Sequence, residues 1–182
     1  MQLTGRLIIE REIISGAEDA GIQQQGVDVR LDDVRRMSDD IPGLVPSTGN
    51  GKTYIPHTTS MYTEWDEERD CEYYYLEPGY YEISFVESCK IPANCAMYFK
   101  TRSSLVRCGA EVRSGQFDGG FETDKMGAFL KVEMPIRIDR GARVAQAIVT
   151  ETYTVNDKDL YNGQWQGDKQ RDSHPEKDLS NN

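Results

Sequence analysis

The chain has 182 residues, of which 37% are hydrophobic and 29% charged, and its formal net charge is −10. These values allow one domain with or without a tail. They exclude a long nucleic-acid polymer as the main partner, because polymer phosphates need a basic surface. A small anionic ligand is compatible with them, since a few arginines can be focused locally on an acidic protein.

The first elements predicted in chain order are a helix and a strand. Residues 6–21, RLIIEREIISGAEDAG, predict a short helix that ends at a glycine. Residues 26–37, GVDVRLDDVRRM, alternate apolar and polar side chains, as a strand does. Residues 38–70 are rich in Pro, Gly, Ser and Thr, and predict a long excursion with a hairpin at residues 48–54, TGNGKTY.

The pattern becomes all-β from Tyr73 onward. Short apolar runs are broken by turn signals such as EPG and IPAN, which favours a sandwich or barrel over alternating strands and helices. Residues 161–182 are polar and have little to bury, so we expect a mobile tail after a single domain of residues 1–160.

The location of the protein is predicted from its N-terminus and its cysteines. No stretch approaches the roughly 20 apolar residues of a membrane span, and MQLTGRLIIEREI does not have the form of a signal peptide. No two cysteines form a C-x-x-C pair, and we expect buried free thiols rather than disulfides or a metal site at Cys71, Cys89, Cys95 and Cys108. We therefore expect a cytoplasmic protein with no membrane partner. His57 and His174 have no second ligand at metal spacing, which argues against a zinc hydrolase or zinc deaminase.

The stretch KTRSSLVRCG combines cations with hydroxyl donors. Arg102 carries a guanidinium fork, Ser103 and Ser104 carry hydroxyls, and Arg107 offers a second cation. Arginine forms bidentate, charge-assisted hydrogen bonds to phosphate, so this stretch is a candidate phosphate site. An R-S-S tripeptide alone is also typical of a capped turn with solvated arginines.

Two further stretches contain candidate ligand contacts. In SGQFDGGF, Asp118 precedes two glycines that allow a close approach of the backbone or a positive φ. An ordinary hairpin turn explains the same pattern equally well. In GQWQGDKQ, Trp165 and Gln166 stand between glycines, as in a segment that closes over a base or sugar. The alternative there is a disordered tail with one exposed indole.

Together these stretches resemble the trimeric dUTPase and dCTP deaminase superfamily. The resemblance covers roughly residues 26–168, in the family's order, through GVDVRL, LEPGYYEISFVESCKIP, TRSSLVR, FDGGF, RGARVAQAIV and YNGQWQGD. The L-x-P-G-x-Y strand and the tail are similar to those of archaeal-type dUTPases. The resemblance implies a mostly β fold, a distorted, jelly-roll-like barrel with a short N-terminal helix. It also implies a homotrimer with active sites at subunit interfaces.

The resemblance further implies a dUTP diphosphatase that forms dUMP and pyrophosphate by attack of water on the α-phosphate. Asp118 matches the aspartate that orients this water, and Phe121 takes the place of the usual Tyr or Trp beside the sugar. Mg²⁺ would be held mainly by the phosphates, with Asp28 as a candidate contact through water. The positions that match substrate contacts are Arg102, Ser103, Ser104, Arg107, Val112, Ser114, Gln116, Phe121, Gln146, Trp165 and Gln166.

One position departs from the deaminase pattern. The deaminases carry a proton-shuttling glutamate on the strand after the D-x-G turn, and here that position falls on Lys131. Glu133 lies on the same strand face, so a shift of alignment would place a carboxylate there. A dCTP deaminase, alone or bifunctional, therefore stays as an alternative. A nucleotide-binding trimer without activity is the second alternative.

Overall fold

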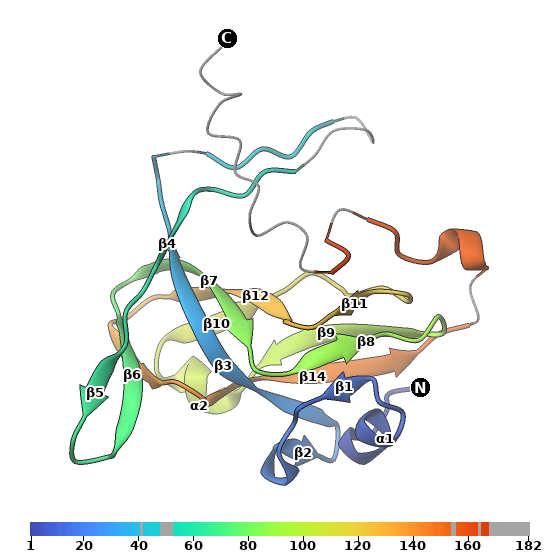
Figure 1. Cartoon of the computed structure of the whole chain (residues 1–182), viewed down its shortest axis with the longest axis horizontal. Coiled ribbons are helices and arrows are strands. Elements are labelled where there is room, and N and C mark those ends of the chain that lie inside the picture. Colours follow the sequence, from blue (N-terminus) through green and yellow to red (C-terminus); the bar gives the residue numbers. More distant parts are fainter. Residues whose placement is uncertain (41, 48–52, 154–155, 164, 168–182) are drawn as a thin grey trace.

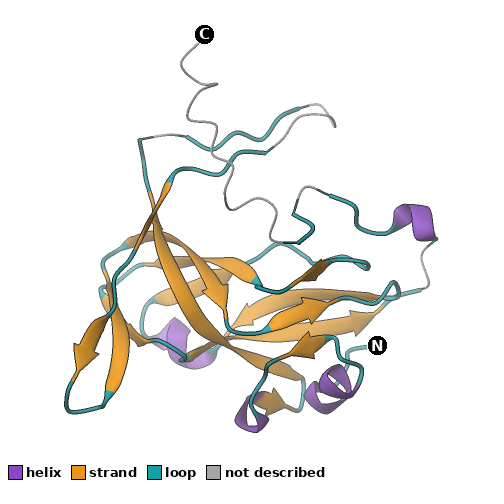
Figure 2. Ribbon diagram, viewed as in Figure 1, coloured by secondary structure: helices purple, strands orange, loops and turns teal. Residues whose placement is uncertain are grey.

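The computed structural model describes residues 1–40, 42–47, 53–153, 156–163 and 165–167. Within these residues strands predominate and the helices are short (Figure 2), as the sequence predicts. The elements in chain order are α1 (Gly5–Glu10), β1 (Ile14–Ser15), η1 (Asp19–Gly21), β2 (Ile22–Gln23), β3 (Gly26–Met37), β4 (Thr58–Ser60), β5 (Glu64–Asp66), β6 (Cys71–Leu76), β7 (Gly79–Phe85), β8 (Ser88–Lys90), β9 (Cys95–Thr101), α2 (Ser103–Arg107), β10 (Ala110–Arg113), β11 (Glu122–Thr123), β12 (Gly127–Val132), β13 (Ile136–Asp139), β14 (Arg143–Glu151) and η2 (Asp157–Asp159).

The central sheet has the strand order β10-β12-β7-β3-β14-β9, and it curves so that its two end strands meet (Figure 1). Side-chain hydroxyls supply much of this closure. Thr101 Oγ1 accepts from the N–H of Val112 at 2.9 Å and donates to its carbonyl at 3.0 Å. Ser114 Oγ accepts from the N–H of Phe99 at 3.1 Å. The result is the nearly closed barrel that the resemblance implies.

The core lies inside this barrel, and the longest strand shows how the sequence builds it. Val27, Val29 and Leu31 of β3 are fully buried, which confirms the predicted alternation. The next buried residue is Val34, because the register of β3 against β7 shifts between Leu31 and Asp33. Such a bulge adds one residue and moves the later side chains to the opposite parity. The alternation of apolar and polar residues in the sequence does not predict this bulge.

The N-terminal prediction was only partly correct. The helix ends at Glu10, and Glu12 adopts a positive φ of 56°, so no glycine ends it. The following isoleucines are buried, Ile13 at 0% and Ile14 at 1% exposure, and Ile14 pairs with Cys89 in the small sheet β1-β8-β11. Burial of these apolar residues outweighs continuation of the helix, as tertiary packing commonly overrides helix propensity.

The excursion of residues 38–70 contains more regular structure than predicted. β4 pairs with β3, and β5 pairs with β6 in a third sheet, β13-β6-β5. The β5–β6 hairpin projects from one side of the barrel (Figure 1). Leu44 and Tyr54 exchange two backbone hydrogen bonds of 2.9 Å, as the flanks of a hairpin do. The centre of the predicted hairpin, residues 48–52, lies outside the described residues.

The cysteines are free, as predicted, but they are not all buried. Cys89 and Cys95 are buried, Cys71 is half-buried and Cys108 is exposed, because Cys108 follows the short helix α2 at the surface. Within the described residues no helix is long and apolar enough to cross a bilayer, and no group of three or more acidic, Cys or His side chains could hold a metal ion. His174 lies outside the described part of the chain.

Candidate active site

The R-S-S motif stands at the junction of β9 and α2. β9 ends at Thr101, Arg102 precedes the helix, and α2 begins at Ser103. The N–H groups of Leu105 and Val106 both bond to the carbonyl of Arg102, at 3.0 and 3.2 Å. This tight turn leaves the hydroxyls of Ser103 and Ser104 exposed to solvent.

A cavity of about 540 Å³ opens beside this motif. Its lining residues are Gln23, Asp28, Lys100, Thr101, Arg102, Ser103, Val106, Arg107 and Gln146. Three of these side chains are cations and one is an acid, so the cavity is locally cationic in a chain whose net charge is −10. Such local focusing suits a small polyanion. Four predicted substrate contacts meet here, namely Arg102, Ser103, Arg107 and Gln146, whereas Ser104 does not line the cavity.

A buried carboxylate pairs with one cation of this cavity and with an arginine outside its lining. Asp28 is 3% exposed, and its Oδ2 lies 3.1 Å from Nε of Arg102 and 3.6 Å from Nη1 of Arg143. Its Oδ1 accepts from Nε2 of Gln146 at 3.3 Å. The β3–β14 pairing places Gln146 directly opposite Asp28, so this contact follows from the sheet register. Arg102 also donates to the carbonyl of Arg143 at 3.1 Å, which fixes its guanidinium.

Residues 112–118, here called the hairpin, contain several predicted substrate contacts and run from the barrel wall to the solvent-exposed surface. Val112 is 6% exposed and both its backbone groups bond to Thr101, so this residue serves the barrel closure. Beyond it, Gln116 and Asp118 are exposed. Nε2 of Gln116 donates to Oδ1 of Asp118 at 2.9 Å, so the amide orients the carboxylate.

The two glycines after Asp118 are explained by the chain itself. A Cβ on Gly119 would lie 2.7 Å from the carbonyl oxygen of Ala93. Gly120 has a φ of +89°, and a Cβ there would lie 3.1 Å from Cβ of Leu160. Only glycine avoids these contacts and this strain. The close approach of the backbone that these glycines allow is thus made toward neighbouring segments of the same chain.

The aromatic residue after the glycines is also engaged internally. Phe121 is 8% exposed, and its ring packs edge-on against Phe117 at 5.2 Å and against Tyr161 at 5.4 Å between centroids. In this conformation little of the ring surface is exposed for contact with a ligand. Trp165 is 41% exposed, and the amide of Gln166 bonds to Gly120 and Glu122 of its own subunit.

The predicted site residues therefore fall into two groups. One group lines the cationic cavity. The other is the hairpin, the D-G-G-F turn and residues 161–163 and 165–167 of the tail, none of which lines that cavity. Asp118 is thus not among the residues that line the cavity with the cations. The sequence analysis missed Gln23, Lys100, Thr101 and Arg143, although Lys100 and Thr101 directly precede the R-S-S motif.

The two candidates for the position of the deaminase glutamate, Lys131 and Glu133, form an ion pair with each other. Lys131 lies on β12 opposite Glu111 and Tyr80, and its Nζ pairs with the carboxylate of Glu133. The hydrogen bond with Glu133 raises the pKa of Lys131, which keeps the amine protonated. Glu133 is exposed, and its own carboxylate is engaged by the lysine. Neither group is arranged as a free base.

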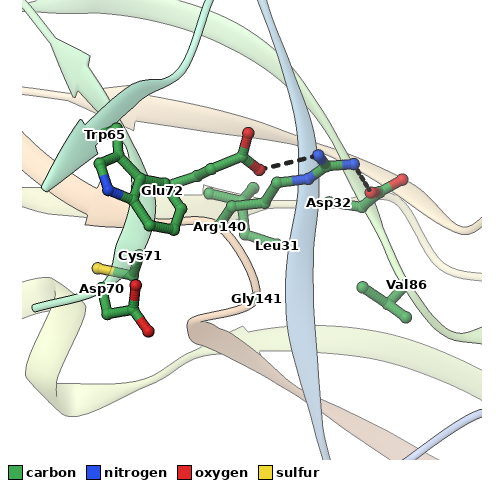
Figure 3. Close-up of a pocket in the computed structure, with 9 residues that line it drawn as sticks. All are labelled: Leu31, Asp32, Trp65, Asp70, Cys71, Glu72, Val86, Arg140 and Gly141. Atoms are coloured by element: carbon green, nitrogen blue, oxygen red, sulfur yellow. Dashed lines mark hydrogen bonds and ion pairs between the residues drawn. The ribbon is translucent and has the colours of Figure 1, made fainter. Parts of the chain in front are cut away.

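A second hollow of about 440 Å³ lies between the β5–β6 hairpin and the barrel (Figure 3). Arg140 crosses it and donates to Asp32 and Glu72, each at 3.1 Å. Trp65 forms one wall, and Leu31 and Val86 lie on the opposite side (Figure 3). This hollow has no counterpart in the sequence analysis.

The cationic pocket beside a short helix on a nearly closed barrel has the charge that suits a small phosphorylated molecule. The chain belongs to the dCTP deaminase-like family, whose sequence profile matches residues 2–152.

Curated relatives refine this assignment. The chain is 30% identical to a deoxyuridine 5'-triphosphate nucleotidohydrolase of Methanocaldococcus jannaschii, over 86% of this chain and 94% of the relative. It is 29% identical to a probable enzyme of the same name from Aeropyrum pernix, over 92% and 99% of the two chains. It is 31% identical to another from Halobacterium salinarum, over 83% and 86%.

A solved structure shows the same fold. The 2'-deoxycytidine 5'-triphosphate deaminase of Agrobacterium tumefaciens superposes with a TM-score of 0.57 at 17% identity. The match covers 81% of this chain but only 48% of the deaminase, so the chain spans about half of that structure. At this identity the likeness concerns the fold alone.

Proposed function

We propose that this protein is a dUTP diphosphatase, which hydrolyses dUTP to dUMP and pyrophosphate. The observation that carries the proposal is the cationic cavity built on the R-S-S motif. The chain also matches, over most of their length, archaeal relatives that are named for this activity. The family name alone would equally suit a deaminase. The ion pair at Lys131 favours the diphosphatase.

The cavity residues bind and neutralise the triphosphate. Arg102 and Arg107 supply cations, and Ser103 supplies a hydroxyl donor. As the bond between the α-phosphorus and the bridging oxygen breaks, negative charge grows on the departing pyrophosphate. Fixed cations stabilise that charge without reorganising, which is a large contribution in phosphoryl transfer.

Asp118 orients the attacking water and accepts its proton. Its Oδ1 is held by Gln116, so Oδ2 is left to accept a proton from water as the new P–O bond forms. A base positioned in this way contributes about 10²–10⁴-fold to the rate. Arg102 and Gln146 bind the phosphates, and Trp165 covers the nucleotide.

A homotrimer would complete the site. Asp118 and the hairpin do not line the cavity of their own subunit, so the hairpin of one subunit must meet the cavity of the next. Val106 lines the cavity and is 55% exposed, which fits coverage by a neighbouring subunit.

Mg²⁺ fits this site as a companion of the substrate. Within the described residues there is no cage of metal ligands, and the oxygens of Asp28 are engaged by Arg102, Arg143 and Gln146. Mg²⁺ commonly keeps its waters and takes phosphate oxygens as ligands. The ion would neutralise phosphate charge, and Asp28 would contact it through water.

Hydrolysis in ¹⁸O-labelled water tests the reaction. Attack on the α-phosphorus places the label in dUMP and none in pyrophosphate, as mass spectrometry of the products would show. Label in pyrophosphate would locate the attack on the β-phosphorus and remove Asp118 from its proposed position.

Mixed trimers test the shared site. Asp118→Asn and Arg102→Ala are each expected to be inactive. After joint refolding at equal amounts, about one quarter of the sites would combine an intact hairpin with an intact cavity, if the two come from different subunits. Recovery near that fraction of wild-type activity supports the interface. No recovery places both residues in one subunit's site.

A further inference from the structure

The C-terminal segment, residues 156–163 and 165–167, packs against the turn that carries Asp118. The N–H of Tyr161 donates to the carbonyl of Gly119 at 2.8 Å. Nε2 of Gln166 donates to the carbonyl of Gly120 at 3.0 Å, and its Oε1 accepts from the N–H of Glu122 at 3.4 Å. The N–H of Gly167 then donates to the carbonyl of Glu122 at 3.0 Å.

Tyr161 is the centre of this packing. One edge of its ring contacts Phe121, with 5.4 Å between centroids. Its hydroxyl accepts from the N–H of Trp165 at 3.1 Å. A Cβ on Gly163 would lie 2.7 Å from the phenol carbon that bears the hydroxyl, so the chain bends closely around the ring.

The turn is shaped to receive this segment. Gly120 lies against Leu160 and Tyr161, where a side chain would collide and where its φ of +89° favours glycine. The D-G-G-F sequence is therefore matched to the tail of its own subunit. The contact with Leu160 thus adds to the positive φ as a reason for glycine at this place.

We propose that Tyr161 and Gln166 are positioning residues, which fasten Trp165 and the Asp118 turn into one unit within a single subunit. The inference rests on the proposed function and deepens it. Gln166 acts through the turn and does not contact substrate, in contrast to the role that the family resemblance implies for it. Movement of the tail then moves the turn that carries Asp118, so closure over the nucleotide and placement of the carboxylate occur together.

The test isolates Trp165 by its fluorescence. Trp65→Phe leaves Trp165 as the only tryptophan, since the chain has two. In the protein without nucleotide, Tyr161→Ala or Gln166→Leu should raise acrylamide quenching of Trp165 by about twofold, because the side chain is 41% exposed and its release exposes the rest. Tyr161→Phe removes the hydroxyl alone and should give a smaller rise. Asn162→Ala, an exposed position in the same segment, is the matched control and should leave quenching unchanged.

Kinetics with dUTP and Mg²⁺ give the second measurement. A positioning role predicts that Gln166→Leu lowers kcat by about tenfold while KM stays within about twofold. A rise in KM at constant kcat, with unchanged quenching, would make Gln166 a substrate contact and overturn the proposal. Unchanged quenching in both Tyr161→Ala and Gln166→Leu would overturn the fastening itself. If the wild-type protein did not hydrolyse dUTP, the quenching result would still decide the fastening, so the two failures are distinguishable.

Discussion

Asp28 and Arg102 form an ion pair at the floor of the cationic cavity, where Oδ2 of Asp28 lies 3.1 Å from Nε of Arg102 and the carboxylate is 3% exposed. A buried charge needs a partner, because desolvation otherwise outweighs its interactions. The pair holds the guanidinium at the cavity wall and joins the strand β3 to the R-S-S motif.

Asp28→Asn keeps the shape of the side chain and removes its charge. We expect kcat/KM for dUTP to fall by about 10–100-fold, the equivalent of one charge-assisted hydrogen bond, because Arg102 loses the anion that orients it. Calorimetry with a non-hydrolysable imido analogue of dUTP should show a matching loss of affinity. Asp33→Asn, on the same strand and outside the cavity, is the control. An unchanged kcat/KM in Asp28→Asn would contradict the organising role.

Glu87 and Glu18 both pair with Arg30 but differ in burial, so the two allow the effect of burial on the stability of an ion pair to be measured. Glu87 is fully buried and accepts from the N–H of Arg30 at 2.9 Å and from its Nε at 2.8 Å. Glu18 pairs with the same guanidinium but its side chain is 60% exposed. Glu87→Ala should lower the free energy of unfolding by about 3–5 kcal/mol, and Glu18→Ala by less than about 1 kcal/mol. Urea unfolding measures both, and equal losses would refute the distinction.

Asp32 makes stability depend on pH in acid. Burial alone would raise its pKa, but hydrogen bonds from Lys125 and Arg140 outweigh burial and hold the pKa below the usual 3.8. A lowered pKa in the folded state gives stability that is complete above the unfolded value and is lost as pH falls below it. The difference in unfolding free energy between wild type and Asp32→Asn should therefore shrink between pH 6 and pH 3. A difference that stays constant would mean that these ion pairs contribute nothing.

The cysteines should differ sharply in reactivity. Burial raises the pKa of Cys89 to about 12, so its thiolate is scarce at pH 8. Cys108 is exposed. Reaction with Ellman's reagent at pH 8 should show a fast phase whose amplitude falls by one thiol in Cys108→Ser, and Cys89 should react only after unfolding. An unchanged amplitude of the fast phase in Cys108→Ser would contradict the burial pattern.

The sequence predicted the elements whose local signals agree with the fold. Two such signals are the alternation at Val27, Val29 and Leu31 and the R-S-S motif. Each depends only on residues that are close in the chain, so it can be recognised in one sequence. The β3 bulge at residues 31–33 and the early end of α1 depend on distant partners, namely β7 and β8. No local pattern encodes such contacts.

The candidate site was predictable in its chemistry but not in its arrangement. The cations Arg102 and Arg107 and the amide of Gln146 meet in one cavity, as their motifs indicate. Arg143 was not predicted as a site residue, because only the sheet register brings it to Asp28. Lys100 directly precedes the R-S-S motif, so its place beside the cavity was open to prediction from the sequence. The glycines after Asp118 illustrate the reverse case, since their pattern was visible but their partners, Ala93 and Leu160, were not.

The proposed reaction is hydrolysis of dUTP without deamination of dCTP. Product analysis by ion-exchange chromatography distinguishes the two reactions, with purified protein, Mg²⁺ and either dUTP or dCTP. We expect dUMP and pyrophosphate from dUTP, and unchanged dCTP, because the family resemblance assigns the deaminase's base position to Lys131, whose amine the hydrogen bond with Glu133 keeps protonated. Formation of dUTP or dUMP from dCTP, or no product from dUTP, would contradict the proposal.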